Sequence, residues 1–380
     1  MSVTIPMVDL KGQYEKIKTE INNGINEVIE SSAFIKGPQV KEFENQLAQY
    51  LNIKQVIACA NGTDALQIAL MALQLQPGDE VIIPCFTYIA TAEVIALLRL
   101  KPILIDVEDN YFCIDPQLIE SKITGKTKAI VPVHLFGQCA NMNQIMAIAN
   151  KYNLYVIEDT AQAIGAHYQL ANNTQQTSAG GIGVIGTTSF FPSKNLGCYG
   201  DGGALFTNDE KLARQIRMIC NHGQEKQYVH DIIGVNSRLD SIQAAVLLAK
   251  LPHLNTYAEA RNQVANWYDE LLSGNEHIII PKRDQNSTHV FNQYTIQIKG
   301  IDRDSIRKHL SENNIASAVY YPQTVYQQKA FSDLGYQTGD FPVAEKLTQT
   351  VLSLPMHTEM TQEIATLIAK EVLTAINKHK

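Results

Sequence analysis

The chain has 380 residues, 45% of them hydrophobic and 18% charged, and its formal net charge is −7 with an isoelectric point near 5.8. This composition indicates a globular protein with a large core, and the absence of any basic run argues against a nucleic-acid partner. The N-terminus lacks a signal-peptide layout, and the longest apolar run, VIALLRLKPILIDV, is broken by Arg99, Lys101 and Pro102. Six scattered cysteines without CxxC spacing predict reduced thiols and no metal site. Together with the N-terminus and the broken apolar run, they predict a cytoplasmic location and no membrane partner.

Short apolar runs alternate with helical patterns from about residue 55 to residue 210. The expected strands are 55–60, 80–84, 102–107, 128–136 and 154–159, and the expected helices are 64–75, 89–98 and 141–152. This alternation is typical of βαβ units in a mostly parallel sheet covered on both faces, which makes the chain an α/β protein. Ligands of such sheets bind at the carboxyl ends of the strands, so the residues that follow each strand are the candidates for a site.

The pattern changes after about residue 250. The expected elements there are a long polar helix at 254–272, strand-like runs at 277–281 and 291–298, and helices around 304–314 and at 361–380. The sequence therefore predicts two domains. Residues 1–250 would form a large α/β domain with an N-terminal helical segment, and residues 251–380 a smaller α+β domain.

The turn ANGTDAL joins an expected strand to an expected helix. The free N–H groups of Gly62, Thr63 and Asp64 at the start of that helix can bind an anion, aided by the helix dipole. An ordinary turn capped by Asn61 or Thr63 is the competing interpretation.

Two carboxylates, Glu158 and Asp159, end the expected strand LYVIED. Because side chains alternate along a strand, at most one of them enters the crevice. Such a carboxylate can hold a cation or a protonated ring nitrogen, although a helix cap is equally compatible with the pattern. His134, at the end of AIVPVH, fits either the site or the core.

The glycines of GGIGVIG match GxGxxG, but the context excludes a dinucleotide site. That fingerprint needs a strand before it and a helix opening at it, whereas here a polar loop precedes it, the strand-like VIGTTSFF follows it, and Pro192 blocks a helix.

Lys194 lies in SFFPSKNLGCYGDGGA, where no helical or strand period surrounds it. Aromatic residues and a proline flank it, and no acidic residue follows until Asp201. A lysine that acts as a nucleophile needs a lowered pKa, which burial provides, and such lysines form Schiff bases with pyridoxal phosphate (PLP). An anion pocket, a carboxylate for a pyridine nitrogen and this lysine together predict a PLP site.

Motifs along nearly the whole chain resemble the DegT/DnrJ/EryC1/StrS family of sugar aminotransferases, which are PLP enzymes of fold type I. The motifs are VDLKGQY, FIKGPQVKEFE, ANGTDAL, PCFTYIATAEVI, VPVHLFGQ, IEDTAQAIGA, SFFPSKNLGCYGDGGA, GVNSRLDSIQAA and VYYP. The resemblance implies a large domain with a mostly parallel seven-stranded sheet and a smaller C-terminal α+β domain.

The resemblance also implies roles for residues around the cofactor. Lys194 would bond to PLP and move the proton, Asp159 would face the pyridine nitrogen, Gln162 would lie near the phenolic oxygen, and Tyr88 would stack on the ring.

Further residues would hold the cofactor's phosphate. These are Gly62, Thr63 and Ser189 within one chain, and Asn236 reaching across from a second copy. The resemblance therefore implies a homodimer with shared active sites.

By resemblance, L-glutamate donates the amino group and leaves as 2-oxoglutarate, with pyridoxamine phosphate (PMP) as the intermediate form. The expected acceptor is the C3 keto group of UDP-3-keto-GlcNAc or its uronate, for surface-polysaccharide synthesis. The alternatives are a dTDP-3-keto-6-deoxyhexose or a 4-keto nucleotide sugar. A sugar dehydratase would carry histidine in place of Lys194. A PLP-binding regulator without turnover usually carries an extra DNA-binding module, for which we expect neither the length nor a basic segment here.

The UDP assignment depends on Ser193, Cys198 and Tyr199, where relatives acting on dTDP sugars are expected to have Gly, Ala and Leu. Tyr320, Tyr321 and Arg238 are candidate sugar or diphosphate contacts, with packing and interface salt bridges as the alternative for each. The stretch YYPQTVYQQ departs from the family's usual Pro-Leu-His, and this departure leaves a sugar contact there open.

Overall fold

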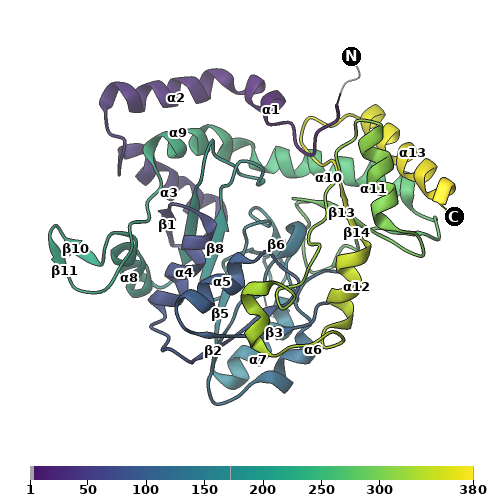
Figure 1. Ribbon diagram of the computed structural model, residues 1–380. Coiled ribbons are helices and arrows are strands. Elements are labelled where there is room, and N and C mark those ends of the chain that lie inside the picture. Colours follow the sequence, from purple (N-terminus) through teal and green to yellow (C-terminus); the bar gives the residue numbers. More distant parts are fainter. Residues whose placement is uncertain (1–3, 172, 380) are drawn as a thin grey trace.

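A computed structural model describes residues 4–171 and 173–379, which are built around a seven-stranded sheet (Figure 1). Its strands are β1 (Gln55–Cys59), β2 (Glu80–Pro84), β3 (Lys101–Ile105), β4 (Thr127–Ile130), β5 (Tyr155–Asp159), β8 (Ile185–Ser189) and β9 (Gly203–Thr207). They are arranged in the order β1, β9, β8, β5, β4, β2, β3. β9 pairs antiparallel with β1 and β8, and the remaining neighbours pair parallel. The predicted α/β fold with a mostly parallel sheet is confirmed.

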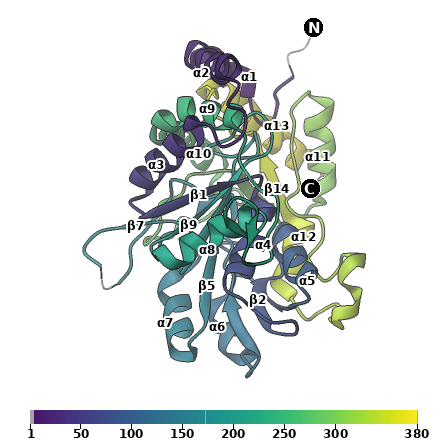
Figure 2. The same ribbon diagram turned by 90° about the vertical axis from the view of Figure 1, so that its left-hand side faces the viewer.

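Helices cover this sheet. Every residue of β2 and β9 is buried, and because successive side chains point to opposite faces, both faces of these strands are shielded from solvent. The helices up to residue 250 are α1 (Leu10–Lys16), α2 (Lys18–Ser31), α3 (Pro38–Leu51), α4 (Gly62–Ala72), α5 (Ala90–Leu97), α6 (Pro116–Ile119), α7 (Met142–Tyr152), α8 (Glu210–Cys220) and α9 (Ser241–Lys250). α4 packs against β8 and β9, and α2 and α3 pack against α9 at one end of the molecule (Figures 1 and 2).

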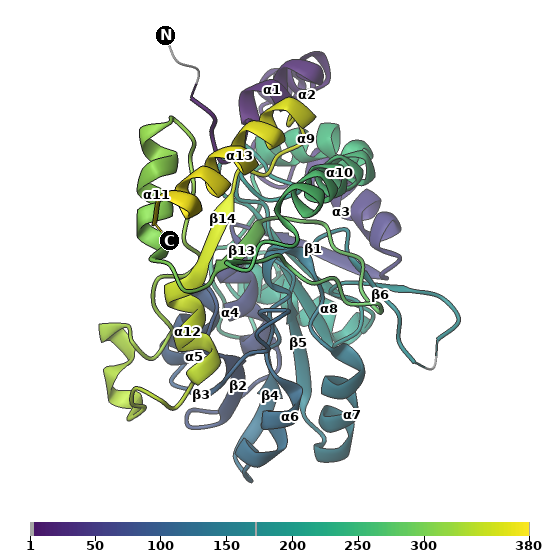
Figure 3. The same cartoon turned by 90° about the vertical axis from the view of Figure 1, so that its right-hand side faces the viewer.

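The C-terminal part has an antiparallel sheet of its own. Its elements are α10 (Leu254–Leu272), β12 (Ile278–Ile279), β13 (Tyr294–Ile298), α11 (Arg303–Glu312), α12 (Pro342–Thr350), β14 (Val351–Leu354) and α13 (Gln362–His379). β13 pairs with both β12 and β14, and α13 packs against α10 and α11 (Figure 3). Two short hairpins complete the chain, β6 (His167–Tyr168) with β7 (Thr177–Ser178) and β10 (Gln224–Lys226) with β11 (Val229–His230).

The predicted domain boundary at 250/251 coincides with the end of α9. The buried residues of one apolar core all lie beyond residue 263 and join α10 and α13 to the small sheet, with Ile5 of the N-terminal segment packed against them. However, Val325, Phe331 and Phe341 pack into the core of the large sheet. The division into domains 1–250 and 251–380 therefore stays a prediction.

The helices and strands expected between residues 55 and 159 occur within a few residues of their predicted positions, except that the strand expected at 128–136 ends at Ile130. Sequence reasoning missed α6, α8, α9 and α12 among the helices, and β9 and β14 among the strands. Among the helices of residues 4–171 and 173–379, none combines the length and apolar character needed to cross a bilayer.

Candidate active site

The carboxyl ends of β1, β2, β5 and β8 open into one pocket of about 510 Å³. This position is expected, because the ends of parallel strands meet at the same edge of a sheet. The sequence-predicted residues that line it are Gly62, Thr63, Tyr88, Asp159, Gln162, Ser189, Lys194, Tyr320 and Tyr321. The structure thus brings together the residues predicted from one chain, except Arg238.

Lys194 is held in a tight turn that follows β8. The N–H of Lys194 donates to the carbonyl of Phe191 at 2.8 Å, and Pro192 takes the second position of this β-turn, where its fixed φ is favourable. Within the described residues, the Nζ atom of Lys194 makes no hydrogen bond or ion pair. Burial lowers the pKa of Lys194 to about 8, and the Asp159 carboxylate opposes that shift. Its amine can therefore lose its proton near neutral pH, as a nucleophile or a base must.

Asp159 points into the pocket with two hydrogen bonds to its carboxylate. Oδ1 accepts from the N–H of Ala161 at 3.1 Å, and Oδ2 accepts from the hydroxyl of Thr91 at 3.1 Å. Burial raises the pKa of Asp159, whereas the Ala161 N–H, Lys194 and the Thr91 hydroxyl oppose the rise. Since a carboxylate has about four lone-pair positions, Asp159 can still accept from a third donor.

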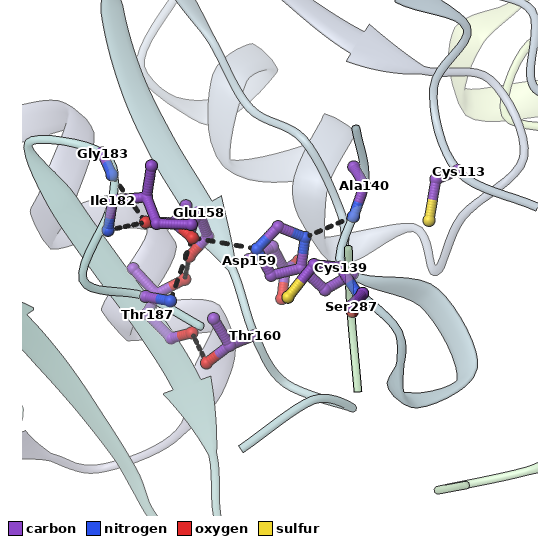
Figure 4. A network of polar contacts seen from close by, with 12 residues as sticks. Cys113, Cys139, Ala140, Glu158, Asp159, Thr160, Ile182, Gly183, Thr187 and Ser287 are labelled. Atoms are coloured by element: carbon purple, nitrogen blue, oxygen red, sulfur yellow. Dashed lines mark hydrogen bonds and ion pairs between the residues drawn. The ribbon is translucent and has the colours of Figure 1, made fainter. Parts of the chain in front are cut away.

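Glu158 points to the opposite side of β5, as the strand alternation predicts, and is fully buried. Its carboxylate accepts from the N–H groups of Gly180, Ile182 and Gly183 at 3.0, 2.7 and 2.6 Å (Figure 4). The glycine-rich turn that mimics a dinucleotide fingerprint therefore binds a carboxylate of its own chain.

His134 completes this network and belongs to the core. Its Nδ1 accepts from the N–H of Ala140 at 3.1 Å, so Nε2 donates to Glu158 at 3.0 Å. The N–H of His134 also donates to the carbonyl of Asp159 at 3.0 Å. The network thus fixes the backbone next to Asp159 from outside the pocket.

The N-terminus of α4 faces the pocket. Asn61 caps it, because its side chain accepts from the N–H of Asp64 at 2.8 Å. The expectation that Asp64 helps to bind an anion is therefore wrong, and the N–H groups of Gly62 and Thr63 remain. A Cβ on Gly62 would lie 2.7 Å from that of Ser189, so only glycine fits there. The hydroxyl of Ser189 accepts from the N–H of Phe191 at 3.2 Å and keeps its own proton to donate.

Gln162 is fixed at both ends of its amide. Its Oε1 accepts from the N–H of Phe136 at 2.7 Å, and its Nε2 donates to the hydroxyl of Tyr321 at 3.2 Å. The ring of Tyr88 lies 6.2 Å from that of Tyr321 and is 58% exposed, which leaves one face of Tyr88 free at the pocket mouth.

Asn236 and Arg238 lie outside the pocket of their own chain. Asn236 is exposed beyond the β10–β11 hairpin. Arg238 donates to Asn221 at 3.1 Å and lines a separate hollow with Lys36. Neither residue lines this pocket, so their predicted contacts stay predictions.

Two of the three residues used to argue for a UDP sugar also lie outside the pocket. Ser193 lines it, but Cys198 is fully buried and Tyr199 packs toward α9, and neither is among the lining residues. Of these three residues, only Ser193 can therefore contact a ligand in the pocket of its own chain, and the assignment of a UDP sugar from them stays a prediction.

Thr87 belongs to the stretch Phe86 to Tyr88, which the sequence marks as a candidate because it follows an expected strand. Thr87 lines the pocket after β2, and its buried hydroxyl has no hydrogen-bond partner within the described residues. Sequence reasoning missed Asn292 and Gln293, which reach the pocket from just before β13, where no local sequence signal indicates a site.

A sequence profile of the DegT/DnrJ/EryC1/StrS aminotransferase family matches residues 15–373. The chain belongs to this family. It is 46% identical over 353 residues to the UDP-2-acetamido-2-deoxy-3-oxo-D-glucuronate aminotransferase of Pseudomonas aeruginosa, covering 93% of this chain and 95% of that protein. It is 45% identical over 373 residues to the UDP-N-acetyl-3-dehydro-α-D-glucosamine 3-aminotransferase of Acidithiobacillus ferrooxidans, covering 97% and 98%. A pleiotropic regulatory protein of Geobacillus stearothermophilus is 46% identical over 363 residues, covering 95% of each chain.

Solved structures agree with this DegT-family assignment. S. venezuelae DesV, in complex with a ketimine intermediate, superposes with a TM-score of 0.93 at 35% identity, covering 98% of each chain. Bacillus subtilis NtdA, with bound cofactor PMP, superposes with a TM-score of 0.89 at 32% identity, covering 99% of this chain and 86% of that one. The fold of this DegT-family chain is therefore that of the family's aminotransferases.

Proposed function

We propose that this DegT-family chain is a PLP-dependent aminotransferase that moves an amino group from L-glutamate to the C3 carbonyl of a nucleotide-linked 3-keto sugar. The observation that carries the proposal is the amine of Lys194, with its lowered pKa, in the same pocket as the Asp159 carboxylate. The names of two relatives at 46% and 45% identity favour a UDP-linked, N-acetylated sugar or its uronate.

The pocket fits PLP in three respects. The N–H groups of Gly62 and Thr63 at a helix N-terminus, with the Ser189 hydroxyl, suit a phosphate. Asp159 has a free lone pair for a ring N–H. The buried hydroxyl of Thr87 has no partner among the residues described and can donate to a ligand. When bound, PLP supplies the electron sink that stabilises negative charge on the carbon losing its proton.

The chain's own residues supply binding and proton transfer. Lys194 takes the proton from Cα of the donor and, in the second half-reaction, returns a proton to C3 of the sugar. Asp159 keeps a proton on the ring nitrogen, held in position by Thr91 and Ala161. The ring of Tyr88, which has a free face at the pocket mouth, would stack on the ring of the bound cofactor.

We also propose a homodimer in which Asn236 contributes to the second copy's phosphate site. The β10–β11 hairpin projects from the body of the molecule (Figure 1), and Tyr228 and Ile233 on this arm are 82% and 86% exposed. Large apolar side chains exposed to this extent on one arm are typical of a protein interface. The reduced state of the six cysteines supports a cytoplasmic location, and a role in surface-polysaccharide synthesis rests on the resemblance alone.

Reverse transamination tests the proposal. The PLP form is mixed with UDP-3-amino-GlcNAc, its uronate, dTDP-3-amino-6-deoxyhexoses or a 4-amino nucleotide sugar, and conversion to PMP is followed by absorbance. We expect conversion with the UDP-3-amino sugars and, separately, with L-glutamate. Conversion with dTDP sugars alone would overturn the UDP assignment, and conversion with the 4-amino sugar alone would overturn C3. If no amino sugar and no amino acid converts the cofactor, the chain binds PLP without turnover, as a regulator would.

A further inference from the structure

The turn that carries Lys194 has no regular structure of its own. Residues 190–202 join β8 to β9 without helix or strand. A lysine that transfers protons must be held within a fraction of an ångström of its working position. Other parts of the fold must therefore fix this turn.

Helix α9 holds the turn through two side chains. Oε1 of Gln243 accepts from the N–H of Tyr199 at 2.8 Å, and Nε2 of Gln243 donates to the carbonyl of Tyr199 at 3.2 Å. Nζ of Lys250 donates to the carbonyl of Gly197 at 2.7 Å. Because Gln243 and Lys250 are seven residues apart, about two helical turns, they lie on the same face of α9.

Lys250 is an unusual residue for this task. It is only 1% exposed, and among the described residues it has no acidic partner. The ring of Tyr199 lies 4.6 Å from Nζ, and burial lowers the pKa of Lys250 to about 8. A buried ammonium without a carboxylate reduces stability, so packing alone would favour an apolar side chain here.

The turn is tight enough to transmit this restraint to Lys194. A Cβ on Gly197 would lie 2.3 Å from the carbonyl oxygen of Pro192, so the two sides of the turn are in direct contact. Asn195, next to Lys194, donates from Nδ2 to the carbonyl of Val290 at 2.8 Å. A displacement at Gly197 therefore cannot be absorbed without moving the residues around Lys194.

We infer that Gln243 and Lys250 are positioning residues for the reaction, which hold the turn so that the amine of Lys194 reaches the carbon atoms between which the proton moves. The inference rests on the role proposed above for Lys194. Neither side chain lines the pocket, so neither touches substrate.

The test uses Lys250→Met and Gln243→Met, which keep similar volume and remove the hydrogen bonds. We expect kcat to fall about tenfold or more in each variant, with the KM for glutamate within about twofold, because misplacement affects the chemical step more than binding. The Tm of Lys250→Met should be unchanged or higher, since a buried charge without an acidic partner has been removed. Amide hydrogen exchange of the peptide covering 194–202, measured without cofactor, should be faster in both variants.

Arg303→Met is the matched control. Arg303 is also a buried cation that donates to backbone carbonyls, those of Val351 and Thr348 at 2.7 and 3.4 Å, but it lies in the C-terminal part away from the pocket. Unlike Lys250, it also pairs with a carboxylate, that of Asp304 at 2.9 Å, so its loss is expected to reduce stability. Its loss should lower Tm and leave kcat and the exchange of 194–202 unchanged.

Unchanged kcat and unchanged exchange in both methionine variants would overturn the inference. A loss of Tm with no change in kcat would do so as well, since it would indicate a structural role. If Lys250→Met does not fold, the same measurements on Gln243→Met test the inference. Gln243 is only half-buried, near the start of α9, so its substitution should disturb folding less. The exchange measurement does not depend on PLP, so it tests the turn separately from the proposed function. Cofactor conversion that persists in Lys194→Ala would contradict the proposed role of Lys194.

Discussion

The charges of Lys194 and Asp159 affect each other's pKa across the pocket, and this effect can be tested directly. The pKa of Lys194 is lowered from 10.5 to about 8 by burial, so its amine is mostly protonated below pH 8 and mostly free above it. In cofactor-free protein, the rate of acylation of Lys194 should rise with pH and level off above about pH 8, as followed by peptide mass spectrometry. Asp159→Asn removes the charge that opposes the shift, so its midpoint should lie lower. A rate that still rises between pH 9 and 10 would contradict the lowered pKa.

Glu158 is the second residue whose contribution can be tested by substitution, here its contribution to stability. Glu158→Gln places an amide NH₂ among three backbone N–H donors, so it should lower the free energy of unfolding by about 3 kcal/mol in urea denaturation. The matched control is Glu120→Gln, because Glu120 forms an exposed pair with Lys151 that should contribute no measurable stability. Equal stability of the two variants would show that the buried network does not support the end of β5.

At the scale of elements, the N-terminus of α4 should bind the cofactor's phosphate only while its cap is intact. Asn61→Ala removes the cap and should cost about 1 kcal/mol of stability. It should also raise the Kd for PLP severalfold, because the N–H groups of Gly62 and Thr63 lose their fixed direction. Fluorescence titration of the cofactor-free protein measures this Kd.

Asn141→Ala is the control for this prediction, since Asn141 caps α7 in the same way by accepting from the N–H of Gln144 at 3.2 Å. It should lose similar stability and keep the Kd for PLP. If both variants bind PLP equally well, the α4 terminus is not the phosphate site.

At the scale of the whole molecule, the shared-site prediction can be tested by complementation. Lys194→Ala and Asn236→Ala are each expected to be nearly inactive as homodimers. Mixed dimers should regain activity, because one of their two pockets then has both an intact Lys194 and an intact Asn236 from the other copy. Transaminase activity is measured after mass spectrometry has shown that the subunits have exchanged. If the subunits have exchanged, both parent proteins are folded and no activity is recovered, the result counts against a shared site.

The sequence by itself determined the βαβ order, the strand-to-helix turn before α4 and the candidacy of Lys194, because these depend on local signals. Local signals left the choice between Glu158 and Asp159 open, and the family resemblance selected Asp159. Strand periodicity, a capping residue and a Pro-flanked lysine are all readable within about ten neighbouring residues. The opposite directions of Glu158 and Asp159 followed from strand alternation alone. The family motifs added the predicted phosphate and ring contacts within one chain, whose residues the structure places at one pocket.

Only the tertiary structure decided which distant residues meet at the pocket and behind it. Asn292 and Gln293 reach Lys194 across about one hundred residues of sequence, and Gln243 and Lys250 reach its turn from a helix that no local signal linked to the site. Tyr199 follows Lys194 closely in the sequence, yet it packs against α9 outside the pocket. The physical reason is that an irregular turn has no period to fix its side chains, so their directions are set by the packing of the elements around them.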